Sequence, residues 1–252
     1  MHQTSELIIE SGMSLGNQSI GKCHALLPTA GSGSRLGGDL PKQFRQLAGK
    51  PMLSHALEAF LQSPHVESIW IGVSPGFIDN PILKKFAQGK KPIHFLPTGG
   101  PTRQETVRNT LGKMLESGLP INDWVMVHDA ARPCITATDI NLLIDTLRAD
   151  EVGGILALSS HDTLKDVQGK NIVGTLDRSH IWRALTPQMF KYGSLKNALE
   201  IAEGNPAITD EASALELQGL QPKIVEGRPD NIKITRPEDL ALAQFYMEHQ
   251  ND

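Results

Sequence analysis

The sequence predicts an α/β fold in which helices cover both faces of a doubly wound, mostly parallel sheet, with a β-hairpin arm inserted late in the chain. Four apolar runs, at residues 25–27, 69–73, 124–127 and 155–158, are rich in Val, Ile or Leu and show no clean alternation with polar residues. Strands of this kind are buried on both faces, as in parallel sheets. Segments with helical periodicity separate the runs, and this order favours one sheet between two layers of helices.

Local signals place the helices between these strands. Residues 52–61 put Met52, Ala56 and Phe60 on one helical stripe, and Pro51 suits the first turn. Thr138 is expected to cap the helix that starts at residue 140. Further helices are predicted over residues 103–115, 140–147, 195–202, 210–217 and 237–246, and further strands over residues 223–225 and 232–234.

The alternation of strands and helices breaks between residues 159 and 187, where polar turns surround the short strand-like segment 172–175. This pattern predicts a hairpin arm. A lone two-stranded hairpin is marginally stable in water, so the arm is expected to pack against something, and a second copy of the chain is a good candidate. Residues 1–20 are interpreted as a flexible tail, and residues 21–252 as one domain.

Composition and charge restrict the function classes. In 252 residues, 24 Lys and Arg stand against 28 Asp and Glu, for a net charge of -4, which argues against nucleic acid as the main partner. A small polyanion is compatible with this balance, because a few cations can gather in one cleft. Cys23 and Cys134 are too few for a disulfide framework, which suits the cytoplasm. No apolar run reaches 18 residues, so no membrane partner is expected.

The first functional motif is a glycine-rich loop that follows the first predicted strand. Gly31 and Gly33 allow backbone N–H groups to approach and surround phosphate oxygens. The loop is not a dinucleotide fingerprint, because Leu36 stands where a third glycine is required, and no Gly-Lys in the chain precedes Ser or Thr as in a P-loop. Two cations, Arg35 and Lys42, favour a triphosphate ligand. The alternative is a surface turn with two solvated cations.

The second motif places Asp129 just past the predicted strand at residues 124–127, at the edge where α/β sheets hold ligands. A carboxylate there can hold Mg²⁺, and the ion in turn bridges phosphate oxygens. Arg132 lies three residues on and can reach the same anion. The alternative is a helix-capping Asp129 that pairs with Arg132 at the surface. His128 is interpreted as a packed or hydrogen-bonded histidine, since nothing near it completes a metal triad.

Two further segments carry polar side chains toward possible sites. Residues 99–106 form a glycine turn into a helix with Arg103 near its start. A helix N-terminus favours an anion or a polar base edge, and an ordinary helix start is the alternative. Lys233 separates Ile232 from Ile234, so its side chain is expected to point away from theirs, either to solvent or into a site.

The order of these motifs resembles the 2-C-methyl-D-erythritol 4-phosphate cytidylyltransferase family of the non-mevalonate isoprenoid pathway, over nearly the whole chain from about Cys23 to Tyr246. The glycine loop is shared with many nucleotidyltransferases, whereas the Asp-Ala-Ala-Arg-Pro and Thr-Asp-Glu-Ala segments in this order are strongly specific. The matching segments are residues 30–35, 41–43, 103–107, 128–133, 182–188, 208–212 and 230–233.

The resemblance implies a Rossmann-like nucleotidyltransferase that converts CTP and methylerythritol phosphate into CDP-methylerythritol and pyrophosphate, with Mg²⁺ or another divalent cation. Catalytic roles are implied for Arg35, Lys42, Arg178 and Lys233. Nucleotide contacts are implied for Ala30, Gly31, Gly33, Arg103, Thr106 and Asp129. Substrate contacts are implied for Asp129, Arg132, Thr163, Arg178, Thr186 and Lys233, and the implied metal ligand is Asp129.

The resemblance also implies a homodimer. In this family the hairpin reaches across to the neighbour's substrate, so Thr163 and Arg178 are expected to act there. One departure is visible, since Thr29 stands where many members carry alanine. Its hydroxyl is expected near the base, without a change in the chemistry. Residues 1–20 have no clear counterpart.

Two other functions are weighed against this one. A cytidylyltransferase for another polyol phosphate, such as ribitol 5-phosphate, would use the same loop and the same Asp-Ala-Ala-Arg-Pro segment. The residues around Arg178 and Lys233 would decide between the two acceptors, and the sequence leaves that choice open. A catalytically silent nucleotide-binding regulator would lack Arg35, Lys42 or Asp129, and all three are present.

Overall fold

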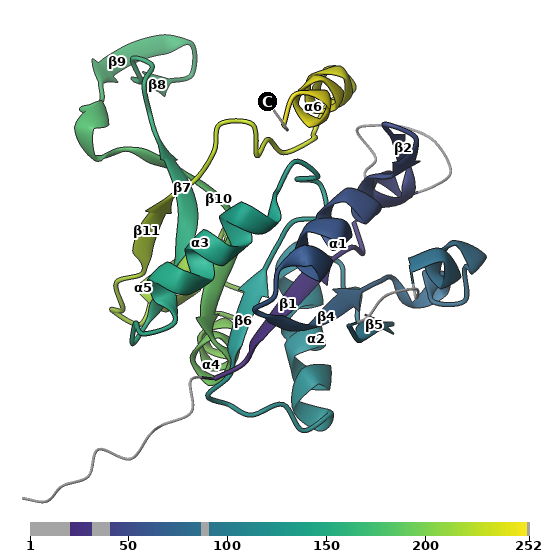
Figure 1. Ribbon diagram of the computed structural model, residues 1–252. Coiled ribbons are helices and arrows are strands. Elements are labelled where there is room, and N and C mark those ends of the chain that lie inside the picture. The colour runs from purple at the N-terminus through teal and green to yellow at the C-terminus, as the bar shows by residue number, and fades with distance from the viewer. Residues whose placement is uncertain (1–20, 32–40, 87–90, 251–252) are drawn as a thin grey trace, which may run out of the picture.

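The computed structural model describes residues 21–31, 41–86 and 91–250, so the predicted tail, Gly33 and Arg35 lie outside the described residues. Its main sheet has seven strands in the order β11-β7-β10-β6-β1-β4-β5 (Figure 1). In chain order these strands are β1 (Cys23–Pro28), β4 (Val66–Gly72), β5 (Ile93–Leu96), β6 (Trp124–Val127), β7 (Gly153–Ser159), β10 (Trp182–Lys191) and β11 (Lys223–Glu226). Two very short strands, β2 (Gln46–Leu47) and β3 (Lys50–Pro51), pair separately.

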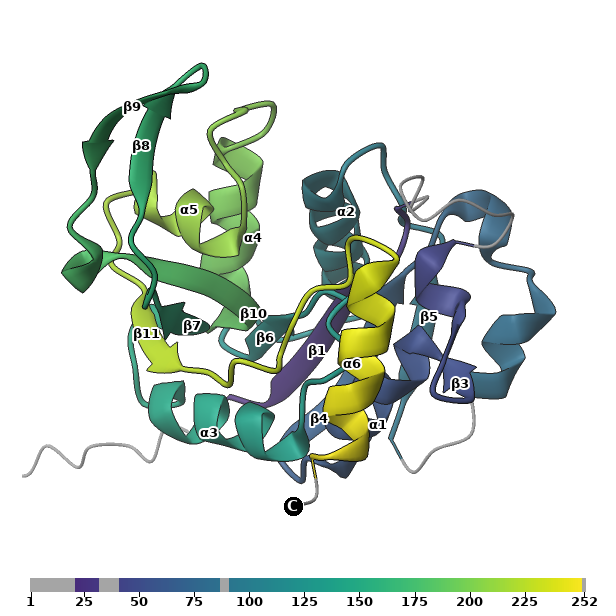
Figure 2. The ribbon, with the colours of Figure 1, turned by 90° about the horizontal axis from the view of Figure 1, so that it is seen from above.

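Helices cover both faces of this sheet, as predicted (Figure 2). Side chains of α1 and α3 pack in one hydrophobic cluster, and those of α2, α4 and α5 pack in a second cluster. The helices are α1 (Met52–Gln62), α2 (Arg103–Glu116), α3 (Ala137–Leu147), α4 (Tyr192–Ile201), α5 (Glu211–Glu216) and α6 (Glu238–Glu248). None of these helices combines the length and the apolar character needed to cross a bilayer.

The central strands lack alternation because successive side chains enter different clusters. In β1, Ala25 and Leu27 pack with α1 and α3, whereas Leu26 packs with α2 and α4. In β6, Met126 packs in the cluster of α1 and α3, and Val127 packs in the cluster of α2 and α4. All five side chains are fully buried. Burying one such side chain contributes roughly 1.5–3 kcal/mol to folding, so both faces of the sheet stabilise the fold.

Strand β10 is the main difference from the predicted sheet. It runs antiparallel to both of its neighbours, β6 and β7. Trp182 already pairs with Ser159 of β7, so this strand begins inside the segment that the sequence assigns to the arm. The register shifts between Ala184 and Gln188, around Pro187, which has no N–H to donate to a neighbouring strand. Because this proline and the polar residues beside it interrupt the apolar residues, the sequence pattern does not indicate the strand.

Two local predictions are wrong. Helix α3 is capped by Thr136 rather than Thr138, because the Thr136 hydroxyl accepts from the Asp139 N–H and a capping box forms. Residues 232–234 form no strand. The backbone N–H of Ile234 donates to the Ala131 carbonyl at 2.8 Å, which ties this segment to the loop after β6.

A separate hairpin lies within the predicted arm. Strands β8 (Lys165–Gln168) and β9 (Asn171–Thr175) pair only with each other and stand away from the main sheet (Figure 1). Three apolar side chains on these strands, Val167, Ile172 and Val173, are exposed. Because an isolated hairpin of this size is marginally stable, these side chains mark a surface suited to burial against another molecule.

A buried polar network closes the amino-terminal end of the sheet. His24 of β1 contacts Ser68 Oγ through Nδ1 at 2.7 Å and Asp123 Oδ2 through Nε2 at 3.1 Å. Trp70 Nε1 donates to the same Ser68 oxygen at 2.8 Å. Since the Asp123 carboxylate only accepts, His24 carries its proton on Nε2 and accepts the Ser68 hydroxyl at Nδ1. The network is therefore complete when His24 is neutral.

This network predicts a loss of stability in mild acid. Burial lowers the pKa of His24 from its ordinary 6.5, although Asp123 opposes the shift. Below that pH the unfolded chain binds a proton that the folded state excludes, so the free energy of unfolding falls as pH decreases. We expect chemical denaturation to show that the free energy of unfolding falls less between pH 7.5 and pH 5 for His24→Asn than for the wild type. Equal slopes would contradict this reading, and His249→Asn, at an exposed position, is the control.

Candidate active site

The start of the glycine loop, at Ala30 and Gly31, and the Asp129 segment meet at the carboxyl ends of β1 and β6, which are adjacent and parallel. A cavity of about 220 Å³ opens there, at the edge where α/β sheets bind ligands. Residues with a predicted site role that line it are Ala30, Gly31, Lys42, Arg103, Thr106, Asp129 and Lys233. The fold thus brings together side chains that lie more than 200 residues apart in the sequence.

The start of the nucleotide loop is fixed by Thr29, which is buried. Its N–H and its hydroxyl both donate to the Gly72 carbonyl, at 2.8 and 3.0 Å. The Gln43 amide donates to the Thr29 carbonyl. Thr29 lines the cavity, and its hydroxyl is used between β1 and the end of β4, so its contact with a base stays a prediction. Its effect is to hold the loop in register with the sheet.

A glycine turn forms the facing wall of the cavity. A Cβ on Gly99 would lie 2.5 Å from the Ala30 Cβ, so only glycine allows the turn to approach the nucleotide loop this closely. Thr106 is buried, and its hydroxyl accepts from the Gly100 N–H and donates to the Thr102 carbonyl, both at 3.0 Å. The Thr106 hydroxyl therefore shapes the turn, while its side chain lines the cavity.

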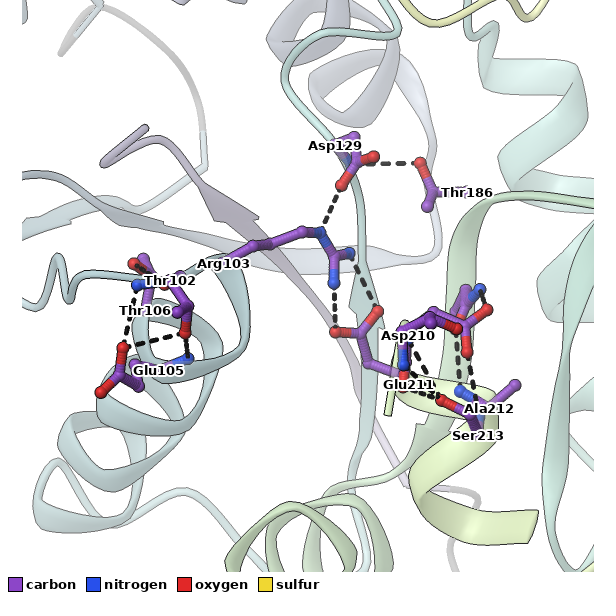
Figure 3. Close-up of polar contacts among 12 residues, drawn as sticks. Thr102, Arg103, Glu105, Thr106, Asp129, Thr186, Asp210, Glu211, Ala212 and Ser213 are labelled. Carbon is purple, nitrogen blue, oxygen red and sulfur yellow. Dashed lines mark hydrogen bonds and ion pairs between the residues drawn. The ribbon is translucent and has the colours of Figure 1, made fainter. Parts of the chain in front are cut away.

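Arg103, the first residue of α2, joins two carboxylates (Figure 3). Its Nε donates to Asp129 Oδ1 at 2.6 Å. Its two terminal nitrogens donate to the two oxygens of Glu211, at 2.7 and 2.9 Å. On the other side, Lys233 Nζ lies 2.7 Å from Asp129 Oδ2. Glu211 belongs to the Thr-Asp-Glu-Ala segment, yet the sequence alone gave no reason to assign it a role in the site.

This arrangement keeps the central groups charged. Burial alone would raise the pKa of Asp129, but Arg103 and then Lys233 hold it well below the usual range of a carboxyl group. Burial likewise opposes the charge on Arg103, and Glu211 followed by Asp129 raises its pKa above the usual value. Asp129 is therefore a carboxylate at neutral pH, and Arg103 is a guanidinium that stays in place.

His128 and Thr186 hold the backbone beneath Asp129. The Asp129 N–H donates to Thr186 Oγ1 at 3.1 Å, and the same hydroxyl lies 3.1 Å from His128 Nδ1. His128 Nε2 faces the Arg132 carbonyl at 3.1 Å. Since a carbonyl only accepts, the proton sits on Nε2, and burial lowers the pKa of His128 to about 4. The interpretation of His128 as a packed, hydrogen-bonded histidine is confirmed, and its ring also packs edge-on against Phe60.

The remaining cations differ in their distance from the cavity. Lys42 lines it, and its ammonium donates to the Ile234 carbonyl at 3.2 Å, beside Lys233. Arg132 lies to one side, where it donates to the Asn231 carbonyl at 2.7 Å and the Ala184 carbonyl at 3.4 Å. The structure therefore places Arg132 against the base of β10 instead of in a surface pair with Asp129.

Thr163 and Arg178 do not line this cavity. Both are exposed, on the segments that connect the hairpin to β7 and β10. Arg178, after the hairpin, donates to the carbonyl of His161, which precedes the hairpin. Figure 2 shows the hairpin beyond α5 and α4, which are drawn between it and α2. Within one chain the structure thus leaves these two predicted site residues away from the others.

The donor set limits how a metal ion could bind. Within the described ranges, no group of three or more His, Cys, Asp or Glu side chains could hold an ion by itself. Of the described residues that line the cavity, Asp129 alone carries a carboxylate, and each of its oxygens already contacts a cation. This set fits a Mg²⁺ ion that takes at most one or two protein oxygens and draws its other ligands from phosphates and water.

A larger groove, of about 730 Å³, lies between α1, the start of α3 and the residues after α6. It contains none of the predicted site residues. Arg228 lines this groove, and its guanidinium forms ion pairs with Asp230 and Asp139. Size alone therefore does not mark the active site, and the smaller cavity at the strand ends holds the relevant chemistry.

A mostly parallel sheet with a loop-lined cavity rich in cations at its strand ends is the arrangement of a Rossmann-like nucleotidyltransferase. The family model for 2-C-methyl-D-erythritol 4-phosphate cytidylyltransferase (IspD) matches residues 23–249. The chain belongs to this family.

Relatives and solved structures agree with this assignment. The protein of that name from Vibrio atlanticus is 44% identical over 229 residues, which cover 90% of this chain and 96% of the relative. A crystal structure of 4-diphosphocytidyl-2C-methyl-D-erythritol synthase is similar with a TM-score of 0.77 and 38% identity, over 90% of this chain and 98% of that chain. The Francisella tularensis cytidylyltransferase structure gives a TM-score of 0.75 and 35% identity, over 89% and 99%.

The close approach of Gly99 to Ala30 generates a prediction. Gly99→Ala should push the two walls of the cavity apart and weaken CTP binding by about tenfold, since overpacking typically costs about 1–3 kcal/mol. Calorimetric titration with CTP measures this. Gly112→Ala, in α2 with nothing within 4 Å of the added Cβ, is the matched control and should bind CTP as the wild type does. Unchanged binding by Gly99→Ala would show that the contact does not shape the site.

Proposed function

We propose that this protein transfers CMP from CTP to 2-C-methyl-D-erythritol 4-phosphate, giving CDP-methylerythritol and pyrophosphate. The observation that carries the proposal is the gathering of Lys42, Lys233 and Asp129 at one cavity beside the glycine loop. Membership of the cytidylyltransferase family supplies the identity of both substrates. The cytoplasm is the proposed location, because it keeps thiols such as those of Cys23 and Cys134 reduced.

The chemistry needs no general base. The nucleophile is a phosphate oxygen of the acceptor, largely dianionic at neutral pH because its second pKa is about 6. The difficulty is to bring this dianion to a triphosphate of the same sign. Cations must offset the repulsion and stabilise the charge that develops on the α-phosphate during an in-line displacement. The bond to the β-phosphate then breaks, and pyrophosphate leaves with the electron pair.

The predicted cations and the nucleotide loop have a place in this scheme. Arg35 and Lys42 are assigned to the triphosphate, and Lys42 lines the cavity, where its ammonium donates to the Ile234 carbonyl. Backbone contacts with the phosphates are assigned to Ala30, Gly31 and Gly33, the first two of which line the cavity.

On the acceptor side, Lys233, Arg132, Thr186 and Asp129 are assigned to contacts with methylerythritol phosphate; Lys233 and Asp129 line the cavity, and Arg132 and Thr186 lie beside Asp129. Asp129 would also be the protein ligand of a Mg²⁺ ion, which would supply positive charge to offset that of the phosphates.

The active unit is proposed to be a homodimer formed through the hairpin. The exposed apolar side chains of β8 and β9 provide a surface to bury, and the marginal stability of an isolated hairpin favours such packing. Thr163 and Arg178 would then reach the acceptor phosphate in the neighbouring subunit. This assignment accounts for two polar residues that lie away from the cavity of their own chain.

Pyrophosphate release tests the function. The protein is assayed with CTP, UTP or ATP and with either methylerythritol phosphate or ribitol 5-phosphate as the acceptor. Turnover confined to CTP and methylerythritol phosphate is the expected result. Preferred turnover of ribitol 5-phosphate would overturn the proposed acceptor, and absence of turnover with every pair would overturn the proposed reaction.

Lys42 generates the first kinetic prediction. Lys42→Ala should lower kcat by about 10²–10³, comparable to the loss of one preorganised donor to a developing negative charge. Lys50→Ala is the control, because Lys50 forms an exposed pair with Glu58 on the surface. Steady-state kinetics measures both variants. A wild-type kcat for Lys42→Ala would show that this ammonium does not act on the transition state.

Arg178 generates the second kinetic prediction. Arg178→Ala should raise the KM for methylerythritol phosphate by about tenfold or more and leave the affinity for CTP close to normal, because charge-assisted contacts to phosphate are worth about 1.5–3 kcal/mol. Lys170→Ala, in the hairpin turn, is the control. Equal losses for both substrates would contradict the assignment of Arg178 to the acceptor.

A further inference from the structure

Four charged side chains of alternating sign run in a chain along the edge of the cavity: Glu211, Arg103, Asp129 and Lys233. The Arg103 guanidinium bonds Glu211 with two nitrogens and Asp129 with its third. Lys233 completes the chain on the second oxygen of Asp129 at 2.7 Å. Figure 3 shows Arg103 lying between the two carboxylates. The chain links α2, α5, the loop after β6 and the segment after β11.

The two ends of this chain differ in mobility. The Glu211 side chain is 1% exposed and is held by a bidentate fork, whereas the Lys233 side chain is 41% exposed and makes a single contact with Asp129. A planar fork fixes both partners, whereas a lysine ammonium is a point charge on a flexible stem. Glu211 is therefore the fixed end of the chain, and Lys233 is the end that can move.

During the reaction, Asp129 and the acceptor phosphate compete for the Lys233 ammonium. A phosphate dianion of the acceptor carries more charge than the Asp129 carboxylate and draws the ammonium away from it. Asp129 then keeps its contact with Arg103 Nε and its backbone bond to Thr186. Arg103 could itself follow the phosphates, but the fork to Glu211 retains it.

Resting on the proposed function, we propose that Glu211 is a positioning residue that acts through Arg103, holding the Asp129 carboxylate at the cavity wall while Lys233 exchanges Asp129 for a substrate phosphate. No bond to Glu211 forms or breaks in the reaction. Its carboxylate supplies a fixed counter-charge, so that one cation stays with the protein while another is released to the substrate.

The rival explanation is a purely structural clamp between α2 and α5. A clamp would affect folding and the shape of the nucleotide cavity, so its loss would lower the melting temperature and weaken CTP binding. A positioning role predicts a different result. When CTP binds without the acceptor, Lys233 stays on Asp129, so loss of the Glu211 charge changes the affinity for CTP little. During turnover Lys233 leaves Asp129. Without the Glu211 charge the Asp129 carboxylate then moves, and kcat falls.

The test compares Glu211→Gln with Glu203→Gln. Glu203 also pairs with an α2 arginine, Arg108, but its side chain is 64% exposed, which makes it a matched control. Glu211→Gln should lower kcat by about 10–100-fold, the scale of a misplacement near 1 Å, and change the dissociation constant for CTP by less than threefold. Glu203→Gln should match the wild type. A wild-type kcat for Glu211→Gln, or a loss confined to CTP affinity, overturns the proposal.

A double-mutant cycle shows whether Glu211 acts through Asp129. In an Asp129→Asn background, Glu211→Gln should cost less than threefold, because the group it positions is gone. Additive losses overturn the inference while leaving the proposed function intact if the wild type turns over CTP and methylerythritol phosphate. A wild type that does not turn over this pair overturns both. If Glu211→Gln does not fold, Glu211→Asp, which keeps the charge but shortens the reach, takes its place in the cycle.

Discussion

The contact of Arg103 with both Asp129 and Glu211 is the interaction on which the rest of the site depends. It joins the first helix residue after the glycine turn to the loop after β6 and to α5. Asp129 and Glu211 are buried, so a loss of either contact would leave a buried carboxylate without this counter-charge, at a cost of several kcal/mol. The three elements therefore fold around one charge cluster, and the cavity wall is formed before any ligand arrives.

This cluster also decides which cations are available to phosphates. Arg103 is committed to two carboxylates of the protein, whereas Lys233 and Lys42 line the same cavity on flexible side chains. An acidic chain can in this way bind two polyanions, because a few of its cations line one cavity at the strand ends. His128, kept neutral by burial, holds the Asp129 backbone without adding a charge.

Most of the architecture follows from short-range patterns. The apolar runs predicted β1, β4, β6 and β7 because strands buried on both faces have no polar alternation. Strand β10 was not predicted, because Pro187 and neighbouring polar residues interrupt its apolar residues and only its pairing with distant strands defines it.

The candidate site was likewise predicted only in part. Lys42, Asp129 and Lys233 were predicted, and they line one cavity. Glu211 was not assigned a role, because its function depends on a tertiary contact with a residue 108 positions away.

A crystal structure of the protein with CTP and Mg²⁺ tests the central claim most directly. The account predicts the triphosphate in the cavity at the ends of β1 and β6, with Lys42 on its oxygens, the ion between the phosphates and Asp129, and Arg103 still bonded to Glu211. A triphosphate bound instead in the larger groove near Arg228, with Lys42 and Asp129 far from any phosphate, would contradict it.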